Sequence, residues 1–347
     1  MRYLVLAVFL LCALPAYGQE LPVTHLKVVG GLGETIQFKK FEEPFWTKEL
    51  AAHSDGRVTA EVTPWDQFGI KGPELLQLTR LGAIVLGTVS LSNIASEDAE
   101  AAGVDLAGLN PDIASLRRSI DAYLPTLRDV YRSRYGLELL AIWSYPAQVI
   151  FCNTPITGLA DLRGVKVRVA SAMHADFIDG LGGIGVTLPY DGLLEGLRKR
   201  VVDCAITGAM SGYRLGLYNV TTHLDATTVS WGPYVLFANR AAWERFDPAV
   251  RAFLTTELQQ LDDRLWPAAE QETRGGIACL TGIGVCTAGP PGHMTLIPTG
   301  DEDRRLVRRS FDTVVSPRWS ERCGTACVAN WNATVGRQFD ITVAASR

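Results

Sequence analysis

The most informative stretch of the chain runs from residue 161 to residue 171 and reads Asp161-Leu162-Arg163-Gly164-Val165-Lys166-Val167-Arg168-Val169-Ala170-Ser171. It is a turn that leads into a short strand, and Arg168 stands inside the apolar run. A buried arginine needs an anion, because an unpaired charge away from water is costly. Its planar guanidinium binds a carboxylate through two parallel hydrogen bonds. The stretch therefore predicts either a carboxylate ligand on Arg168 or a structural salt bridge to an acidic residue of the same lobe.

Strand and helix patterns alternate on both sides of this stretch. Short apolar or alternating runs predict strands at residues 26–29, 58–62, 83–86, 137–142, 149–152, 165–169, 201–206 and 234–238. Helical spacing predicts helices at residues 36–46, 74–81, 113–131, 172–181 and 193–200, and a long one that begins at Asp247-Pro248 and reaches toward Glu270. The alternation indicates an α/β fold. The strands at residues 165–169 and 201–206 suit a mostly parallel sheet. From Cys279 onward the sequence has no clear period and predicts no structure.

The N-terminus has the features of an export signal. Met1 and Arg2 precede a short apolar run, and the small residues Ala16 and Gly18 follow it. The run is shorter than the roughly 20 residues of a membrane-spanning helix, so residues 1–18 are predicted to be a cleaved signal peptide. The expected location is the periplasm, and the roughly 330 remaining residues are enough for two domains.

The cysteines agree with an oxidising compartment. The chain has seven, and one of them, Cys12, falls in the predicted signal peptide. The pairs Cys279 with Cys286 and Cys323 with Cys327 need the least loop closure, which leaves Cys152 to pair with Cys204, although other connectivities stay open. A metal site is not expected, because CxxC spacing is lacking and His293 is the only histidine near the C-terminal cysteines.

Charge and motifs argue against two other classes of protein. The sequence has 33 Lys and Arg against 37 Asp and Glu, so it lacks the basic excess of a nucleic-acid-binding protein. No GxSxG elbow, Walker loop or HExxH helix is present. We therefore expect a protein that is not an enzyme and that uses no cofactor.

Together these segments resemble the substrate-binding proteins of tripartite ATP-independent periplasmic (TRAP) transporters of the dicarboxylate-binding type. The 161–169 segment resembles the family signature of an aspartate, a leucine, a lysine-glycine turn and then lysine-x-arginine-valine. Three further segments agree in order along the chain: Pro64 to Gly69, Gly182 to Pro189, and Leu193 to Asp203.

The resemblance implies a two-lobed α/β periplasmic binding protein with crossing hinge strands and a long hinge-spanning helix. The first lobe is expected to comprise residues 24–142 plus about 235–265, and the second residues 143–234 plus about 266–347. The implied partners are a small organic carboxylate and the TRAP membrane permease subunits. A sensory ligand-binding protein that reports to a kinase is the alternative, with the same pocket chemistry.

The resemblance also implies where the ligand lies. Its carboxylate is expected on Arg168, and the family's frequent second arginine falls at Gln148, which donates hydrogen bonds without a charge. We therefore expect a monocarboxylate with an apolar or aromatic body, held by hinge closure; a dicarboxylate or a keto acid is the alternative. The remaining pocket candidates are Ser171, Tyr190, Thr207 and Trp231 in the second lobe, and Thr88 and Ser90 in the first.

Thr88 and Ser90 follow the predicted strand at residues 83–86, where α/β sheets tend to bind ligands. An ordinary turn is the competing interpretation for these two residues. For Trp231 the competing interpretation is a place in the core, since aromatic side chains supply much of any buried apolar area.

Overall fold

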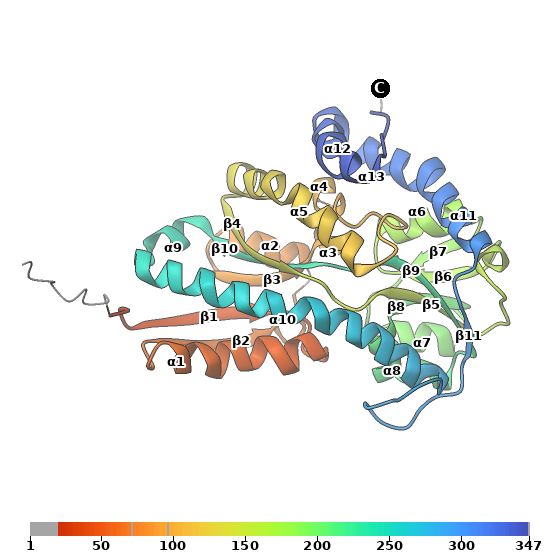
Figure 1. Cartoon of the computed structure of the whole chain (residues 1–347), viewed down its shortest axis with the longest axis horizontal. Coiled ribbons are helices and arrows are strands. Elements are labelled where there is room, and N and C mark those ends of the chain that lie inside the picture. Colours follow the sequence, from red (N-terminus) through yellow and green to blue (C-terminus); the bar gives the residue numbers. More distant parts are fainter. Residues whose placement is uncertain (1–19, 71, 96, 346–347) are drawn as a thin grey trace, which may run out of the picture.

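The computed structural model describes residues 20–70, 72–95 and 97–345, and the predicted signal peptide lies outside these ranges. Two β-sheets form the centres of two lobes (Figure 1). The first sheet has the order β2 (Val58–Pro64), β1 (Thr24–Gly30), β3 (Leu86–Ser90), β10 (Tyr234–Asn239), β4 (Leu137–Trp143). The second has the order β11 (Thr295–Ile297), β9 (His223–Ser230), β5 (Gln148–Cys152), β8 (Cys204–Gly208), β6 (Lys166–Val169), β7 (Ile184–Thr187).

Two strand connections cross between the lobes. The chain leaves the first sheet along β4 and enters the second along β5, and it returns from β9 to β10. Each arriving strand runs against its neighbours: β10 is antiparallel to β3 and β4, and β5 to β8 and β9. Both sheets are mixed, because crossing strands enter each sheet from the opposite end. In the second sheet three of the five strand pairs are parallel, in agreement with the expectation for its strands. The predicted two-lobed α/β fold with crossing strands is confirmed.

Helices cover both sheets. Those packed around the first lobe are η1 (Gln37–Glu42), η2 (Phe45–Glu49), α1 (Leu50–His53), η3 (Trp65–Phe68), α2 (Gly72–Arg80), α3 (Leu91–Ile94), α4 (Ala99–Ala102), α5 (Ile113–Val130), η4 (Tyr131–Tyr135) and α9 (Arg240–Arg245). Those of the second are η5 (Leu159–Leu162), α6 (Ala172–Gly180), α7 (Leu193–Arg198), α8 (Ala209–Arg214) and η6 (Leu217–Asn219). None of the helices in the described ranges combines the length and apolar character of a membrane span.

The long helix α10 (Pro248–Thr281) extends along both lobes (Figure 1). The carboxylate of Asp247 caps its first turn by accepting a hydrogen bond from the Ala249 amide at 2.8 Å. Gly276 allows α10 to lie directly against α8, because a Cβ there would come within 2.4 Å of the Met210 backbone nitrogen. The predicted hinge-spanning helix is confirmed, and it continues beyond Glu270 to Thr281.

The strand predicted at residues 83–86 lies further along the chain. The amides of Ala83 and Ile84 both donate to the Leu78 carbonyl, at 3.0 and 3.2 Å, and so close the end of α2. They cannot pair with a neighbouring strand as well, and β3 begins only at Leu86. Thr88 and Ser90 consequently lie inside the strand, not in a turn after it.

The C-terminal segment, for which the sequence predicted no structure, is helical and contacts both lobes. It comprises α11 (Asp301–Ser310), η7 (Phe311–Val315), α12 (Ser316–Trp331), η8 (Asn332–Gly336) and α13 (Arg337–Phe339). Arg322 pairs with Asp176 of α6 at 2.6 Å, whereas the Trp319 indole donates to the Ala99 carbonyl of α4 at 2.8 Å. This segment therefore connects the lobes in addition to the crossing strands and α10.

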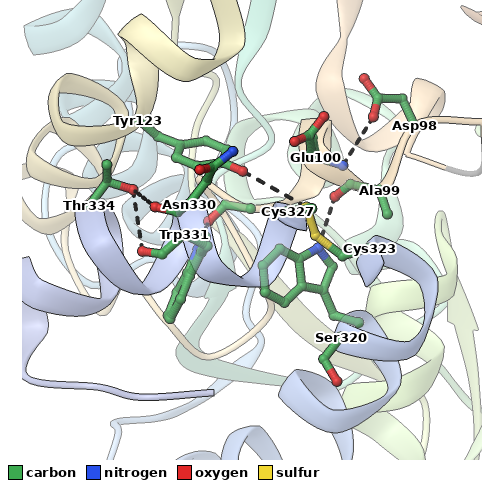
Figure 2. The surroundings of a disulfide bond; sticks show 12 residues. Asp98, Ala99, Glu100, Tyr123, Ser320, Cys323, Cys327, Asn330, Trp331 and Thr334 are labelled. Carbon is green, nitrogen blue, oxygen red and sulfur yellow. Dashed lines mark hydrogen bonds between the residues drawn. A yellow bond between two sulfur atoms is a disulfide. The ribbon is translucent and has the colours of Figure 1, made fainter. Parts of the chain in front are cut away.

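Three disulfides pair the six cysteines that follow the predicted signal peptide, in the pairing that needs the least loop closure: Cys152–Cys204, Cys279–Cys286 and Cys323–Cys327. The first joins opposite residues of β5 and β8. Figure 2 shows the third within α12, next to Ala99 of α4 and Tyr123 of α5. Its place against both helices stabilises the C-terminal segment where it meets the first lobe.

The disulfides are expected to contribute unequally to stability. Cys152–Cys204 spans 52 residues and Cys279–Cys286 spans seven. Loop-closure entropy predicts losses of about 4 and about 2 kcal/mol in the free energy of unfolding when each pair is changed to alanine. Urea unfolding of the two double variants checks this order, and equal losses would contradict it.

Candidate functional site

The candidate residues lie where the two sheets face each other. β1 and β3 run toward the second lobe, and β6 and β8 run toward the first, so their carboxyl ends meet across the hinge. Gln148 pairs with Gly208 and Ser230 at this edge of the second sheet. Ser90 pairs with Tyr234 at the edge of the first. Carboxyl ends of parallel strands are the usual ligand-binding edge of α/β sheets.

Arg168 lies at this edge with a buried guanidinium. The side chain is 3% exposed, and it donates from Nε to the Leu188 carbonyl and from Nη1 to the Ile206 carbonyl, both at 2.9 Å. No carboxylate oxygen of the described residues lies within 4.0 Å of it. The alternative of an internal salt bridge is therefore not realised, and two neutral carbonyls orient a cation that lacks an anion.

Burial changes the pKa of the Arg168 guanidinium. Desolvation lowers the pKa of Arg168 to about 10, and the nearby Tyr190 raises it slightly. The guanidinium still carries its charge at neutral pH. A bound carboxylate would offset the desolvation, since an anion stabilises the charged form of a neighbouring cation.

A cavity of about 110 Å³ lies between the lobes beside Tyr190. Residues 34–37 line it from the first lobe, Tyr190, Ser211 and Arg214 from the second, and Glu272 from α10. Arg168 is not part of this lining, but its Nε donates to the carbonyl of Leu188, two residues before Tyr190, so the cavity lies near the guanidinium. The cavity is small compared with pockets for drug-sized ligands, which hold about 300 Å³ or more.

Stacked aromatic rings lie at the crossing of the strands. Tyr145, between β4 and β5, stacks on Tyr234 of β10 with ring centroids 4.0 Å apart and an interplanar angle of 26°. The Tyr145 hydroxyl lies 3.4 Å from the Thr35 hydroxyl of the first lobe. Burial raises the pKa of Tyr234, and Tyr190 across the hinge also raises it. The site thus has an aromatic side in addition to its cationic one.

Gln148 and Thr207, on adjacent strands of the second sheet, differ in hydrogen bonding. The Gln148 Nε2 donates to the Pro146 carbonyl at 3.3 Å and lies near Gly208 and Gly232. Thr207 is buried on β8, and its side chain forms no hydrogen bond within the described ranges. Both side chains retain hydrogen-bonding capacity at the edge that faces the first lobe.

Ser171 and Trp231 have partners inside the protein. The Ser171 hydroxyl caps α6 by accepting from the His174 amide at 3.4 Å. Trp231 is buried, and its indole donates to the Asn110 carbonyl at 3.1 Å while its amide donates to Asp105 at 2.8 Å. These contacts give both residues a structural role that does not require a ligand.

The two first-lobe candidates also differ. Thr88 is fully buried, and its hydroxyl has no hydrogen-bond partner among the described residues. Ser90 shares a hydrogen bond of 2.8 Å with the Ser92 hydroxyl. Thr88 is therefore the candidate with an unused polar atom, although its burial separates it from the cavity lining.

Three buried polar side chains near the hinge were missed by the sequence analysis: Gln37, Glu42 and Glu272. The Glu42 carboxylate accepts from the Gly31 amide at 2.9 Å through Oε2, while Oε1 has no partner in the described part of the chain. Its place between Phe38 and Phe45 on an apolar helix face is a signal that could have identified it. Gln37 and Glu272 are far apart in the sequence and become neighbours only in the folded chain, so no local pattern could have identified them.

Comparisons with known proteins agree with this arrangement. The model of a family described as bacterial extracellular solute-binding protein, family 7, matches residues 33–285. The C4-dicarboxylate-binding periplasmic protein DctP of Rhodobacter capsulatus is 23% identical over 243 residues, which cover 68% of this chain and 72% of that protein.

Solved structures share the fold at low sequence identity. DctP7 of Bordetella pertussis, an extracytoplasmic solute receptor binding pyroglutamic acid, has a TM-score of 0.77 at 18% identity and covers 89% of this chain and 99% of its own. A TRAP periplasmic solute binding protein of Desulfovibrio salexigens, with bound orotic acid, has a TM-score of 0.78 at 16% identity and covers 90% and 99%.

The buried Glu42 predicts a pH dependence of stability. Desolvation raises its pKa from 4.5 to about 7, and the Gly31 amide lowers it in part. The folded protein thus holds this proton more tightly than the unfolded chain. The stabilising contribution is complete below pH 4.5 and is lost as the pH rises to about 7.

The wild-type protein should lose unfolding free energy as the pH rises from about 4.5 to 7. In Glu42→Gln we expect this loss to be smaller by roughly 1–3 kcal/mol, because the glutamine does not titrate. Urea unfolding across this range measures the slope. The exposed neighbour supplies the control, Glu43→Gln, which should keep the wild-type slope. An unchanged slope in Glu42→Gln would refute the assignment.

Proposed function

The chain belongs to the bacterial extracellular solute-binding proteins of family 7, and from this premise we propose that it captures a small monocarboxylate on Arg168 between its lobes. It is a solute-binding protein of a TRAP transporter and not an enzyme. Such proteins deliver their solutes to membrane permease subunits.

The observation that carries the proposal is the Arg168 guanidinium. It is buried at the ligand-binding edge of the second sheet, is oriented by two backbone carbonyls, and has no acidic partner in the described residues. A carboxylate that binds it would form charge-assisted hydrogen bonds in surroundings of low dielectric constant. A neutral solute would leave the charge unpaired.

The charges around the cavity favour a single carboxylate. Gln148 lacks the positive charge that a second carboxylate would need, and the cavity carries two acidic residues, Glu34 and Glu272, against one arginine, Arg214. A second carboxylate would find one cation, Arg214, in the cavity lining, beside these two acidic side chains. Tyr190 and the stacked Tyr145 and Tyr234 offer faces for an apolar or aromatic body.

Two of the similar proteins bind a cyclic acid of this kind, while others hold a sugar acid or sn-glycerol-3-phosphate. The Bordetella receptor binds pyroglutamic acid and the Desulfovibrio protein holds orotic acid, and each of these solutes is a ring with one carboxylate. A dicarboxylate is the second candidate, because Arg214 lines the cavity and the Rhodobacter relative is a C4-dicarboxylate-binding protein. In that case Arg214 would bind the second carboxylate.

Capture would proceed by hinge closure. The first lobe, residues 24–142 plus about 235–265, would rotate toward the second, residues 143–234 plus about 266–347, about the crossing strands and α10. Ligand on Arg168 would add contacts from both lobes to the closed form, and that form would dock on the permease. We further propose that residues 1–18 export the chain to the periplasm, where proteins of this family act.

Loss of the guanidinium should weaken binding strongly. Arg168→Ala is expected to reduce affinity for a binding carboxylate by well over tenfold, since removing one partner of a buried charge pair costs about 2–5 kcal/mol. Arg168→Lys should restore little, because an ammonium lacks the planar fork. Calorimetric titration measures both, with the exposed Arg163→Ala as control. Equal affinity of Arg168→Ala and wild type would reject the proposal.

A panel of solutes separates the two candidates. Thermal unfolding with pyroglutamate, orotate, benzoate, succinate and malate should give stabilisation by monocarboxylates, because a ligand well above its dissociation constant stabilises the folded state. A preference for succinate or malate that Arg214→Ala removes would instead favour the dicarboxylate.

A further inference from the structure

We infer that Gln37 and Glu272 together recognise an amide group on the solute, so that the transported molecule is a carboxylate bearing an amide at its other end. This inference rests on the proposed function and specifies its substrate class. It comes from the two unpaired polar side chains of the inter-lobe cavity. We call them the Gln37–Glu272 pair.

The pair lies where three parts of the fold meet. Gln37 begins η1 of the first lobe, Glu272 lies on α10, and Arg214 of the second lobe completes this side of the cavity. Gln37 is completely buried and Glu272 is 8% exposed, yet both side chains line the cavity. Closed lobes would therefore hold a solute group against them and away from bulk water.

Neither side chain has its hydrogen bonds satisfied. Both Nε2 and Oε1 of Gln37, and Oε1 of Glu272, lack a partner within the described ranges. Gln37 lies close enough to Glu272 for its amide to lower the pKa of the carboxyl, but the two side chains form no hydrogen bond within 3.5 Å. Buried polar groups of native proteins are nearly always paired, so a group that enters the cavity is expected to supply the missing partners.

The chemistry of the pair selects an amide. A glutamine side chain offers N–H donors and a carbonyl acceptor, and an amide presents one of each in the same plane. Burial raises the pKa of Glu272 to about 7, against the lowering effects of Gln37, Arg214 and Lys40. Glu272 can thus accept a hydrogen bond, or donate one when protonated. An apolar group would leave these atoms unpaired.

The cavity also joins this pair to the carboxylate end of the site. Tyr190 lines the cavity with Gln37 and Glu272, and it follows by two residues Leu188, whose carbonyl accepts the 2.9 Å hydrogen bond from Arg168 Nε. A short solute can therefore place its carboxylate on Arg168, its body against the Tyr190 ring and its polar end at the pair.

Matched solutes test the inference. Succinamate, levulinate and pentanoate have similar length and carry an amide, a ketone and a methylene at the corresponding position; 4-carbamoylbenzoate, 4-acetylbenzoate and 4-ethylbenzoate form the aromatic series. Calorimetry of the wild-type protein should show at least about tenfold tighter binding of the amide in whichever series binds, because a site built for hydrogen bonds rejects analogues that lack them.

Substitutions then assign the preference to the pair. Gln37→Met and Glu272→Met keep side-chain length and should reduce the amide preference below about threefold, while the methylene analogue binds as it does to wild type. Gln259→Met, on an exposed part of α10, is the matched control and should retain the preference. Thermal unfolding without solute checks that each variant is folded.

The outcomes distinguish the inference from the proposed function. Binding of all three members of a series with equal affinity would overturn the amide recognition and leave the carboxylate site intact. A preference retained by both methionine variants would also overturn it. If no carboxylate of either series binds, and Arg168→Ala behaves as wild type toward the full panel, both proposals fail.

Discussion

The positive charge of Arg168 is the constraint on which the site depends. The guanidinium is taken out of water and held by the Leu188 and Ile206 carbonyls, which orient it without neutralising it. A cation in such surroundings interacts strongly with any anion that reaches it, because solvent screens the attraction only weakly. The unpaired charge costs free energy in the empty protein, and it stabilises the solute once the solute is bound.

The crossing of the chain between the lobes gives this charge its place. β5 and β10 each enter a sheet from the opposite lobe, and the sheets become mixed for that reason. The same crossing brings the carboxyl ends of β3 and β6 to the hinge, one in each lobe. Residues far apart in sequence, such as Gln37 and Glu272, therefore line one cavity.

Much of the architecture could be predicted from the sequence because its signals are local. Hydrophobic spacing identified α5, whose apolar stripe is buried, and Asp247-Pro248 marked the start of α10. Arg168 stood out because a charge interrupts an apolar strand. The boundary of β3 was displaced because backbone hydrogen bonds to Leu78, which no hydrophobic pattern records, close the preceding helix.

What could not be predicted depends on contacts between distant segments. Gln37 and Glu272 are ordinary polar residues of helices, and their burial follows only from the packing of η1 and α8 against α10. The C-terminal helices were hidden for another reason. In α12 the backbone leaves helical geometry at Gly324, with φ of 79°, and the Cys323–Cys327 disulfide bridges that break. Its helical period is therefore interrupted within the sequence.

The continuous helix α10 has a mechanical consequence for the motion of the lobes. Pro267 lies inside it and lacks the amide hydrogen that would donate to the carbonyl one turn earlier, so bending there breaks no such hydrogen bond. A helix fixed to one lobe near each end behaves as an elastic beam, and rotation of the lobes must flex it at its softest point. Elastic recoil stored in that bend would favour one angle between the lobes in the absence of solute and set the work that a bound solute must do.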